Sequence, residues 1–340
     1  MAKRPTVADL ARQAGVSVAT VDRGLNRRLP VRDDTAQRVV EAAERIGYHA
    51  TGLLKQRLSE APQRTFGFLL QRRSPFYLAL GAALVEATRS ATFIRGRAVV
   101  EHVEEIVPST IAEQMRALAL RVDALAVVAV DHPTVNAAIA DIAADGKPVF
   151  ALLTDVTAPG RAGCLSVDRH KSGRTAAWAI SRLARRAGKV AILIGSHRYL
   201  SQEVSEISFR SYMREHASEF TVLESIINLD DQRVSYEAVT QLIAANPDLV
   251  GIYSAGGGED GLARALRDEG AGRGIIAVCN ELTVVTRQAL IDRVIDLVLG
   301  TPITGIAQRA VEVMAEALVQ QRHGLVQVLL PADLHISENI

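Results

Sequence analysis

Apolar residues near the start of the chain recur at intervals of three and four, the spacing of one face of a helix. The first such stretch covers residues 7–14. Thr6 precedes it and Asp9 follows three residues later, a pattern that caps a helix by satisfying its unpaired N–H groups. Gly15 comes directly after it, and glycine readily adopts the left-handed conformation that ends a helix. We therefore predict a short helix with the apolar positions Val7, Leu10, Ala11 and Ala14.

A second short helix follows almost at once. Ser17 is placed to cap a helix over residues 18–26, in which Val21 and Leu25 continue the apolar face. Residues 35–48 form a third amphipathic stretch, which completes a small three-helix core. Two short helices joined at a single glycine are typical of a helix-turn-helix, whose second helix enters the major groove of DNA.

Beyond residue 64, short apolar stretches alternate with longer helical ones. Several of the short stretches are apolar throughout, as expected for strands that are covered on both faces. This alternation predicts an α/β fold of doubly wound parallel sheets, and the number of strands fits two lobes with a ligand-binding cleft between them. The expected strands are residues 65–70, 97–103, 124–130, 149–153, 164–167, 190–194, 222–227, 250–253, 275–278 and 297–299, and the expected helices include residues 78–90, 133–145, 173–187, 236–245 and 260–270.

Composition supports a division of the chain into a basic start and a slightly acidic remainder. Residues 1–60 hold 11 Lys and Arg against 7 Asp and Glu, whereas the whole chain of 340 residues holds 39 against 38. A basic segment with helix-turn-helix spacing is the charge distribution expected for contact with DNA phosphates. The hydrophobic content of 48% and charged content of 23% are those of an ordinary globular protein.

The same composition argues against several other classes of protein. No apolar run approaches the roughly 20 residues of a membrane span, and no apolar stretch follows the basic start, so we expect neither a membrane protein nor a signal peptide. Cys164 and Cys279 are the only cysteines, which fits a reducing compartment and predicts buried thiols in a cytoplasmic protein. The eight histidines show no H-x-x-x-H spacing and no Gly-x-Ser-x-Gly sequence occurs, so we expect no metal site and no enzyme.

Residues 6–48 closely resemble the DNA-binding head of lactose-repressor (LacI) family transcription regulators. That family reads T-x-x-D-x-A-x-x-A-G-V-S-x-x-T-V-S-R-x-L-N, and this chain matches nearly every fixed position, with Asp22 in place of the second serine. The remainder is similar to type I periplasmic sugar-binding proteins, with Ser74-Pro75-Phe76-Tyr77 after the first strand. The resemblance implies a head over residues 1–50, a hinge over 51–64, and an effector-binding and dimerisation domain over 65–340, whose chain passes between the lobes near 163 and again near 282.

The resemblance implies that the protein is a transcription regulator, and we expect it to be a repressor. It would bind double-stranded operator DNA as a homodimer, use no cofactor, and respond to a small effector in the cleft, such as a sugar, polyol or sugar phosphate. Val18, Ala19 and Arg23 would face base edges, with Arg23 suited to guanine. The hinge normally carries a leucine that wedges into the minor groove, and Leu58 is the candidate here, although a plain amphipathic linker helix has the same pattern. The remaining residues implied to contact DNA are Thr6, Ser17, Thr20, Asn26 and Arg32.

For the effector, Phe76 and Tyr77 are expected to stack on a sugar ring, or equally to plug the lobe. Arg210 stands near the position of a family arginine, and Gly257 stands where the family usually has Asn-Asp, so the identity of the effector does not follow by analogy. Charged and amide groups suit the hydroxyls of a polyol because they fix its orientation. Those expected to point into the cleft are Asp155, Asp168, Arg169, Asn280 and Glu281.

The glycines of residues 256–261 support an alternative. They contain Gly-x-Gly-x-x-Gly after a predicted strand, and Glu281 lies 20 residues past Gly261, as in a dinucleotide-binding turn. An NAD(P)-dependent Rossmann oxidoreductase is thus the second hypothesis. It is disfavoured because the motif lies late in the chain and no residues for hydride transfer surround it. The same backbone N–H groups also leave a phosphorylated or acidic effector open.

Overall fold

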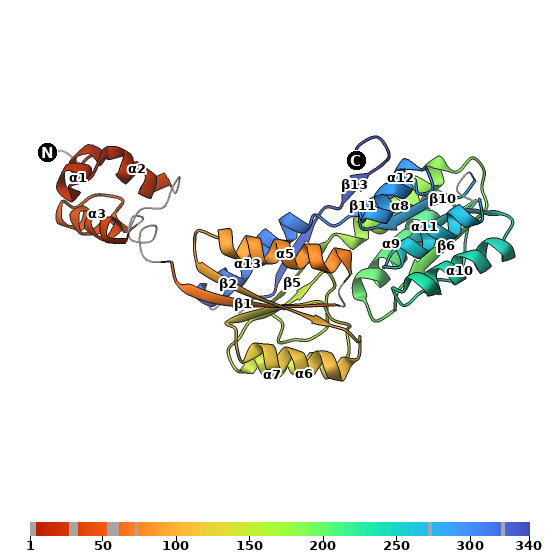
Figure 1. The fold of residues 1–340 in the computed structure, drawn as a ribbon, viewed down its shortest axis with the longest axis horizontal. Coiled ribbons are helices and arrows are strands. Elements are labelled where there is room, and N and C mark those ends of the chain that lie inside the picture. The colour runs from red at the N-terminus through yellow and green to blue at the C-terminus, as the bar shows by residue number, and fades with distance from the viewer. Residues whose placement is uncertain (1–4, 27–32, 53–60, 72–73, 271–273, 321–323) are drawn as a thin grey trace. The chain divides into compact units, whose positions relative to one another are not determined.

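The computed structural model describes residues 5–26, 33–52, 61–71, 74–270, 274–320 and 324–340 (Figure 1). The chain divides into two compact units. The first is Met1–Gln63 with Thr92–Arg95, and the second is Arg64–Ala91 with Gly96–Ile340. The first unit contains the helical head and the second contains the α/β body.

The head is built as its apolar pattern predicts. Its helices are α1 (Val7–Ala14), α2 (Val18–Asn26) and α3 (Asp33–Arg45). The Thr6 hydroxyl accepts a hydrogen bond from the Asp9 N–H at 3.3 Å, and the Asp9 carboxylate accepts one from the Thr6 N–H at 3.0 Å, so the predicted capping box is confirmed. The predicted left-handed end of α1 is also confirmed. Gly15 has φ of +66°, and the core comprises Leu10, Ala11, Ala14, Val21, Val39, Ala42, Ala43 and Tyr48.

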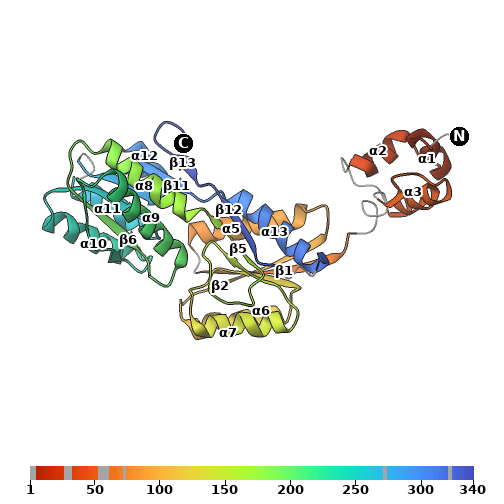
Figure 2. The ribbon, with the colours of Figure 1, turned by 180° about the vertical axis from the view of Figure 1, so that it is seen from behind.

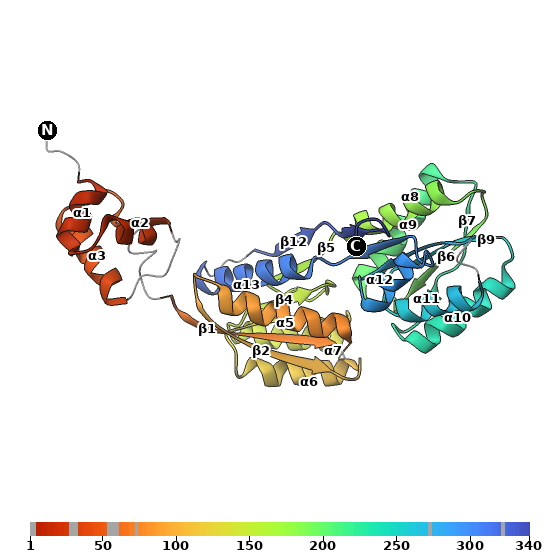
Figure 3. The same ribbon diagram turned by 45° about the horizontal axis from the view of Figure 1, so that its top comes forward.

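The first lobe of the body is a six-stranded sheet between two layers of helices. Its strand order is β12-β5-β4-β3-β1-β2, and the described pairs from β12 to β1 are parallel. Helices α6 and α7 lie on one face of the sheet and α5 and α13 on the other (Figures 1 and 3). The elements are β1 (Gln63–Gln71), α5 (Pro75–Ser90), β2 (Arg95–Val103), α6 (Pro108–Ala119), β3 (Ala124–Val127), α7 (Pro133–Ala144), β4 (Val149–Leu152), β5 (Gly163–Val167), α13 (Ile303–Gln320) and β12 (Val326–Leu330).

The second lobe has the same layered plan around a seven-stranded sheet. The order is β13-β11-β10-β9-β6-β7, with β8 also paired to β6, and only β13 is antiparallel among the described pairs. Apolar residues of α8 and α9 pack on one face, and those of α10, α11 and α12 pack on the other (Figure 2). The elements are α8 (Arg169–Leu183), β6 (Lys189–Ile194), α9 (Leu200–His216), β7 (Thr221–Val222), β8 (Ile226–Ile227), α10 (Gln232–Ala245), β9 (Leu249–Ser254), α11 (Glu259–Asp268), β10 (Ile276–Asn280), α12 (Val284–Ile291), β11 (Leu297–Gly300) and β13 (Asp333–His335).

The chain crosses between the lobes at three places, which differ from the two expected. The first crossing comes after β5, because β5 pairs with β4 in the first lobe. The second follows β11, about 20 residues later than expected near 282, because β11 pairs with β10. The third joins β12 to β13 and was not anticipated. Expected strand 222–227 is in fact two short strands, β7 and β8. Strand β12 was missed because it lies at a sheet edge and is only partly buried, so it lacks a continuous apolar run.

No helix in the described part of the chain combines the length and the apolar character needed to cross a membrane.

Helices α8 and α9 approach each other closely at Gly173. A Cβ atom added at Gly173 would lie 2.1 Å from the carbonyl oxygen of Ser205 and 3.1 Å from the backbone nitrogen of Phe209. These are backbone atoms, which cannot move aside as a flexible side chain does. The absence of a side chain at Gly173 therefore sets the spacing of this helix pair.

We expect Gly173→Ala to destabilise the body by about 1–3 kcal/mol, since it forces the α8–α9 pair apart. A lower midpoint of thermal unfolding of the full-length protein would show this. The matched control is Gly274→Ala, where an added Cβ meets nothing within 4 Å. Equal midpoints for the two variants would contradict the close helix approach.

Candidate functional site

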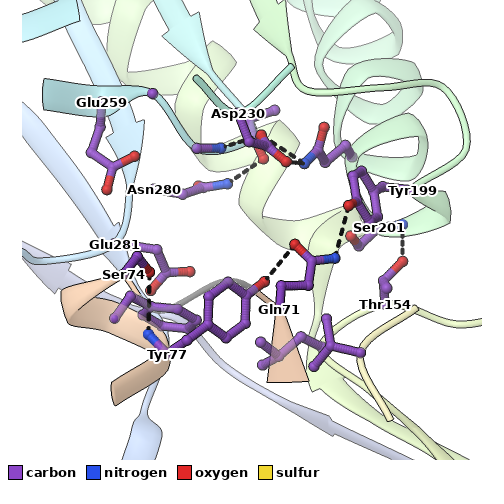
Figure 4. A pocket seen from close by; sticks show the side chains of 18 of the residues that line it. Gln71, Ser74, Tyr77, Thr154, Tyr199, Ser201, Asp230, Glu259, Asn280 and Glu281 are labelled. Carbon is purple, nitrogen blue, oxygen red and sulfur yellow. Dashed lines mark hydrogen bonds between the residues drawn. The ribbon is translucent and has the colours of Figure 1, made fainter. Parts of the chain in front are cut away.

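A cavity of about 170 Å³ lies between the two lobes (Figure 4). Its walls come from loops that follow the strands of both sheets, for example Gln71 at the end of β1, Thr154 after β4, Asp230 after β8 and Asn280 at the end of β10. Ligands of open α/β sheets bind beyond the carboxyl ends of the strands, and both sheets direct those ends to this cavity. The volume is below the several hundred Å³ of pockets for drug-sized molecules, so a small ligand fits best.

Hydrogen bonds between three side chains join the lobes at one end of the cavity. The Tyr77 hydroxyl donates to the Gln71 carbonyl oxygen at 3.3 Å, and the Gln71 amide donates to the Tyr199 hydroxyl at 2.8 Å (Figure 4). Tyr199 directly precedes α9 of the second lobe, yet its ring belongs to the apolar core of the first lobe. Burial raises the pKa of Tyr77 well above its usual value, so its hydroxyl keeps its proton and remains a donor.

Further contacts join the lobes beside Tyr199. The Asp131 N–H donates to the carbonyl oxygen of Arg198 at 3.0 Å, and the Ser201 N–H donates to the Thr154 hydroxyl at 3.3 Å. The loop between β6 and α9 therefore rests on the first lobe. These hydrogen bonds hold the start of α9 against the first lobe at this end of the cavity.

On the second-lobe wall, Asp230 organises the backbone around it. Its carboxylate accepts hydrogen bonds from the Gly257 N–H at 2.6 Å and from the Gln202 amide at 3.3 Å. The Gln202 carbonyl oxygen in turn accepts from the Gly195 N–H at 2.6 Å. These bonds hold the loops after β6, β8 and β9 together, so the wall is fixed before a ligand arrives.

Arg169 and Glu281 form the part of the wall at the first crossing. The two side chains approach to 3.6 Å, and Glu281 also accepts hydrogen bonds from the Thr301 hydroxyl at 2.7 Å and the Thr301 N–H at 3.0 Å. Arg169 is only 11% exposed, and its Nε and Nη1 atoms have no partner among the described residues. Asn280 donates to the Ala255 carbonyl at 2.6 Å, but its carbonyl oxygen is likewise buried without a partner. Buried polar atoms of proteins are nearly always hydrogen-bonded, so these atoms indicate where a ligand or ordered water binds.

Backbone strain is concentrated at the same site. Leu153, Asp230 and Glu281 all line the cavity and have φ of +64°, +51° and +64°, a region that non-glycine residues rarely adopt. Each such residue costs on the order of 1–3 kcal/mol and persists only where surrounding contacts enforce it. Strain of this kind is typical of binding sites.

The structure brings together six of the nine residues expected to bind the effector. Asp155 is one of the three that do not line the cavity in the described part of the chain, because it accepts two hydrogen bonds from Arg161 at 2.8 and 3.2 Å. Asp168 is another, because its carboxylate caps α8 by accepting from the Lys171 N–H at 3.1 Å. The six that line the cavity are Phe76, Tyr77, Arg169, Gly257, Asn280 and Glu281.

Arg210 is the third residue outside the cavity. Its guanidinium donates to the Glu206 carboxylate at 2.8 Å, the Leu223 carbonyl oxygen at 2.8 Å and the Ser225 hydroxyl at 2.9 Å. It ties α9 to the segment after β7. Arg169, from a different helix, is the arginine among the described residues that line the cavity.

Several cavity residues were not anticipated. Their shared signal is position, since each is the last residue of a strand or lies in the loop or first helical turn that comes after one. The loop after expected strand 190–194 and the loop after expected strand 222–227 both bring polar side chains to the cavity. The residues are Gln71, Thr154, Tyr199, Ser201, Gln202, Asp230 and Glu259.

The glycine turn of residues 256–261 gives no support to the dinucleotide alternative. The Gly257 N–H already donates to Asp230, and a carboxylate at that place repels a pyrophosphate. The first turn of α11 carries Glu259 and Asp260, which offset the positive end of the helix dipole. Gly261 serves packing, since a Cβ there would lie 2.0 Å from the Gln232 carbonyl oxygen.

In the head, exposed residues lie at the start of α2, the second helix of the helix-turn-helix. Ser17, Val18 and Ala19 are exposed, and Thr20 accepts or donates a hydrogen bond with Ser17 at 2.9 Å. The Thr20 N–H donates to the Ser17 hydroxyl at 3.2 Å, as predicted for a helix cap. Thr6 is exposed at the start of α1. The side chains of Arg23 and Asn26, and residues Arg32 and Leu58, lie outside the described part of the chain.

Comparison with known proteins matches both units. The periplasmic binding protein domain family matches residues 104–322, and the lacI family of bacterial regulatory proteins matches residues 6–51. The HTH-type transcriptional regulator RegA of Clostridium saccharobutylicum is 38% identical over 65 residues, 19% of each chain. This match thus spans about a fifth of the length of that curated relative.

Solved structures resemble the body of the chain. A solute binding protein of an ABC transporter from Agrobacterium vitis, bound with alpha-D-tagatopyranose, has a TM-score of 0.75 at 18% identity, over 82% of this chain and 96% of that one. A similar protein from Burkholderia graminis, in complex with D-arabinose, has a TM-score of 0.74 at 17% identity, over 83% and 98%. A putative LacI transcriptional regulator from Bacteroides fragilis has a TM-score of 0.70 at 17% identity, over 82% and 98%.

These likenesses establish the body as a two-lobed periplasmic binding protein domain, joined here to a helix-turn-helix head. The chain belongs to the periplasmic binding protein domain family, and its residues 6–51 match the lacI family of bacterial regulatory proteins.

The acidic side of the cavity predicts a pH effect centred on Glu259. Burial, and then the carboxylates of Asp260, Glu281 and Asp230, raise the pKa of Glu259 from 4.5 to about 8. Between these values the folded chain binds more protons than the unfolded chain, so the free energy of unfolding falls as pH rises. We expect Glu259→Gln to reduce this fall, measured as the thermal midpoint across that pH range. Glu269→Gln, an exposed control, should keep the slope of the unmodified protein, and equal slopes in all three would contradict the raised pKa.

Proposed function

We propose that the protein is a sequence-specific DNA-binding transcription regulator, acting as a repressor in the cytoplasm, whose operator affinity is set by a small carbohydrate-like effector. The head supports the DNA-binding half of this proposal. Its exposed Ser17, Val18 and Ala19 begin the second helix of the turn, where helix-turn-helix proteins contact base edges and phosphates. The net positive charge of residues 1–60 favours the DNA backbone.

The effector half rests on the buried atoms of Arg169 and Asn280, at the cavity between the lobes, that have no partner in the described part of the chain. The guanidinium offers donors and the amide offers an acceptor, while Phe76 and Tyr77 present rings. A compact molecule with several hydroxyl groups meets all of these at once. Solute binding proteins of the same fold have structures bound with alpha-D-tagatopyranose and in complex with D-arabinose, which favours the same ligand class.

Control of DNA binding then follows from lobe closure. An effector that prefers the closed lobes shifts the population toward them, and such coupling between sites is typically about 1–3 kcal/mol. A homodimer suits this task, since paired heads bind two half-sites of a near-palindromic operator.

Arg23→Ala tests the placement of the base-reading helix. We expect the variant to lose about 1–3 kcal/mol of operator affinity and to relax specificity at one base pair. Fluorescence anisotropy with operator and single-base variants measures both effects. Arg89→Ala, on α5 and 74% exposed, is the matched control and should bind like the unmodified protein. Unchanged affinity and specificity for Arg23→Ala would place base reading elsewhere.

Phe76→Ala separates effector response from DNA binding. We expect it to abolish the change in operator affinity caused by a sugar identified in a monosaccharide thermal-shift screen, because the ring lines the cavity. Operator binding without sugar should persist. Leu78→Ala is the control on the same helix, since Leu78 is 51% exposed and does not line the cavity in the described part of the chain. Loss of operator binding by Phe76→Ala alone would show that Phe76 serves the fold instead.

A further inference from the structure

The charges that line the cavity are unbalanced. Among its described lining residues are four carboxyl groups and a single guanidinium, that of Arg169. Three of the carboxylates have partners of their own. Asp230 accepts from Gly257 and Gln202, Asp260 accepts from Gln232 and Thr283, and Glu281 accepts from Thr301 and lies beside Arg169.

Glu259 is the one of these four carboxyl groups for which no side chain in the described part of the chain is a partner. Apart from its own backbone N–H, no described residue donates a hydrogen bond to its carboxylate. Figure 4 shows its side chain extending into the cavity from the same wall as Asp230 and Asn280. The raised pKa of Glu259 has the cause expected of such a group, namely burial and then the neighbouring carboxylates of Asp260, Glu281 and Asp230.

Asn280, on the same wall, also has an acceptor atom that lacks a hydrogen-bond donor among the described residues. Asn280 is 3% exposed, its amide N–H is already used by the Ala255 carbonyl, and its buried carbonyl oxygen has no partner among the described residues. The orientation of this amide follows from that hydrogen bond, so the free atom is the acceptor. Two groups of the second-lobe wall thus lack a partner among the described residues: the Asn280 amide oxygen and the Glu259 carboxyl group, which a bound cation would hold ionised.

We propose that the effector is a cationic amino sugar of one ring, whose ammonium group binds at Glu259 and the Asn280 carbonyl oxygen. This rests on the proposed function of the cavity as the effector site. An ammonium group has three donors and no acceptor, which matches the carboxyl group of Glu259 and the carbonyl oxygen of Asn280. Arg169, with its unpaired Nε and Nη1, receives a ring oxygen or hydroxyl on another side of the ligand. Phe76 and Tyr77 face its apolar edge.

The same charges reject anionic effectors. Even with Glu259 protonated, the described lining residues set three carboxylates against one guanidinium, and a phosphate buried beside carboxylates is destabilised. The backbone N–H of Gly257, which an anion would need, is bound to Asp230. Sugar phosphates and acid sugars are therefore poor ligands.

Calorimetric titration of the full-length protein tests the proposal. The ligands are D-glucosamine, D-galactosamine and D-mannosamine, each compared with its parent hexose, its N-acetyl derivative and the hexose 6-phosphate. We expect at least one amine to bind at least about tenfold more tightly than its parent and its N-acetyl form, because a charge-assisted hydrogen bond is stronger than a neutral one. Glu259→Gln should remove most of that preference, measured as the ratio of the amine affinity to the parent-hexose affinity. The matched control Glu269→Gln should keep the preference.

The result that would overturn the amino-sugar proposal is a neutral or phosphorylated form that binds as tightly as its amine. Failure of every amine to bind overturns it as well, as does an amine preference that survives in Glu259→Gln. Operator binding is measured on the same preparations. A protein that recognises its operator and responds to neutral sugars keeps the proposed function without this inference, whereas loss of operator recognition counts against the function itself.

Discussion

The direction of the strands is the constraint on which the binding site depends. Parallel strands bring all their carboxyl ends to one edge of a sheet, and the two sheets of the body turn these edges toward the same cavity. Loops after the strands must satisfy their own backbone groups without a ladder, so they are polar and tied together by side chains such as Asp230 and Gln202. The fold thereby gathers polar groups from distant parts of the chain at a single place.

Acidic side chains outnumber basic ones among the described residues that line the cavity. Glu259 and Asp260 begin α11, where acidic residues normally stabilise a helix through its dipole. Here they also face the cavity with Asp230 and Glu281, so groups that suit local helix formation create an acidic wall. The glycine turn beside them resembles a nucleotide-binding motif by spacing alone. Its surroundings disfavour a bound phosphate, because the backbone N–H groups that would hold it are near carboxylates.

Local signals in the sequence predicted local structure well. The capping pattern at Thr6 and the glycine at position 15 act within one turn of helix, and both behave as predicted. Residues whose position depends on distant partners were harder to place. Asp168 and Arg210 looked available for a ligand, but a helix cap and a contact between α9 and a later segment occupy them. Tyr199 was missed because its ring packs into the lobe opposite to its own helix, which no periodicity reveals.

The three crossings of the chain have a mechanical consequence. The segments that leave β5 and β12 start from neighbouring strands, and those at β11 and β13 end on neighbouring strands of the other sheet. Connecting segments that run side by side form a hinge. They permit rotation of one lobe relative to the other and resist sliding or separation of the lobes. Any swing of one lobe therefore follows a fixed arc, with the side of the cavity near Tyr199 travelling far more than the side near Arg169.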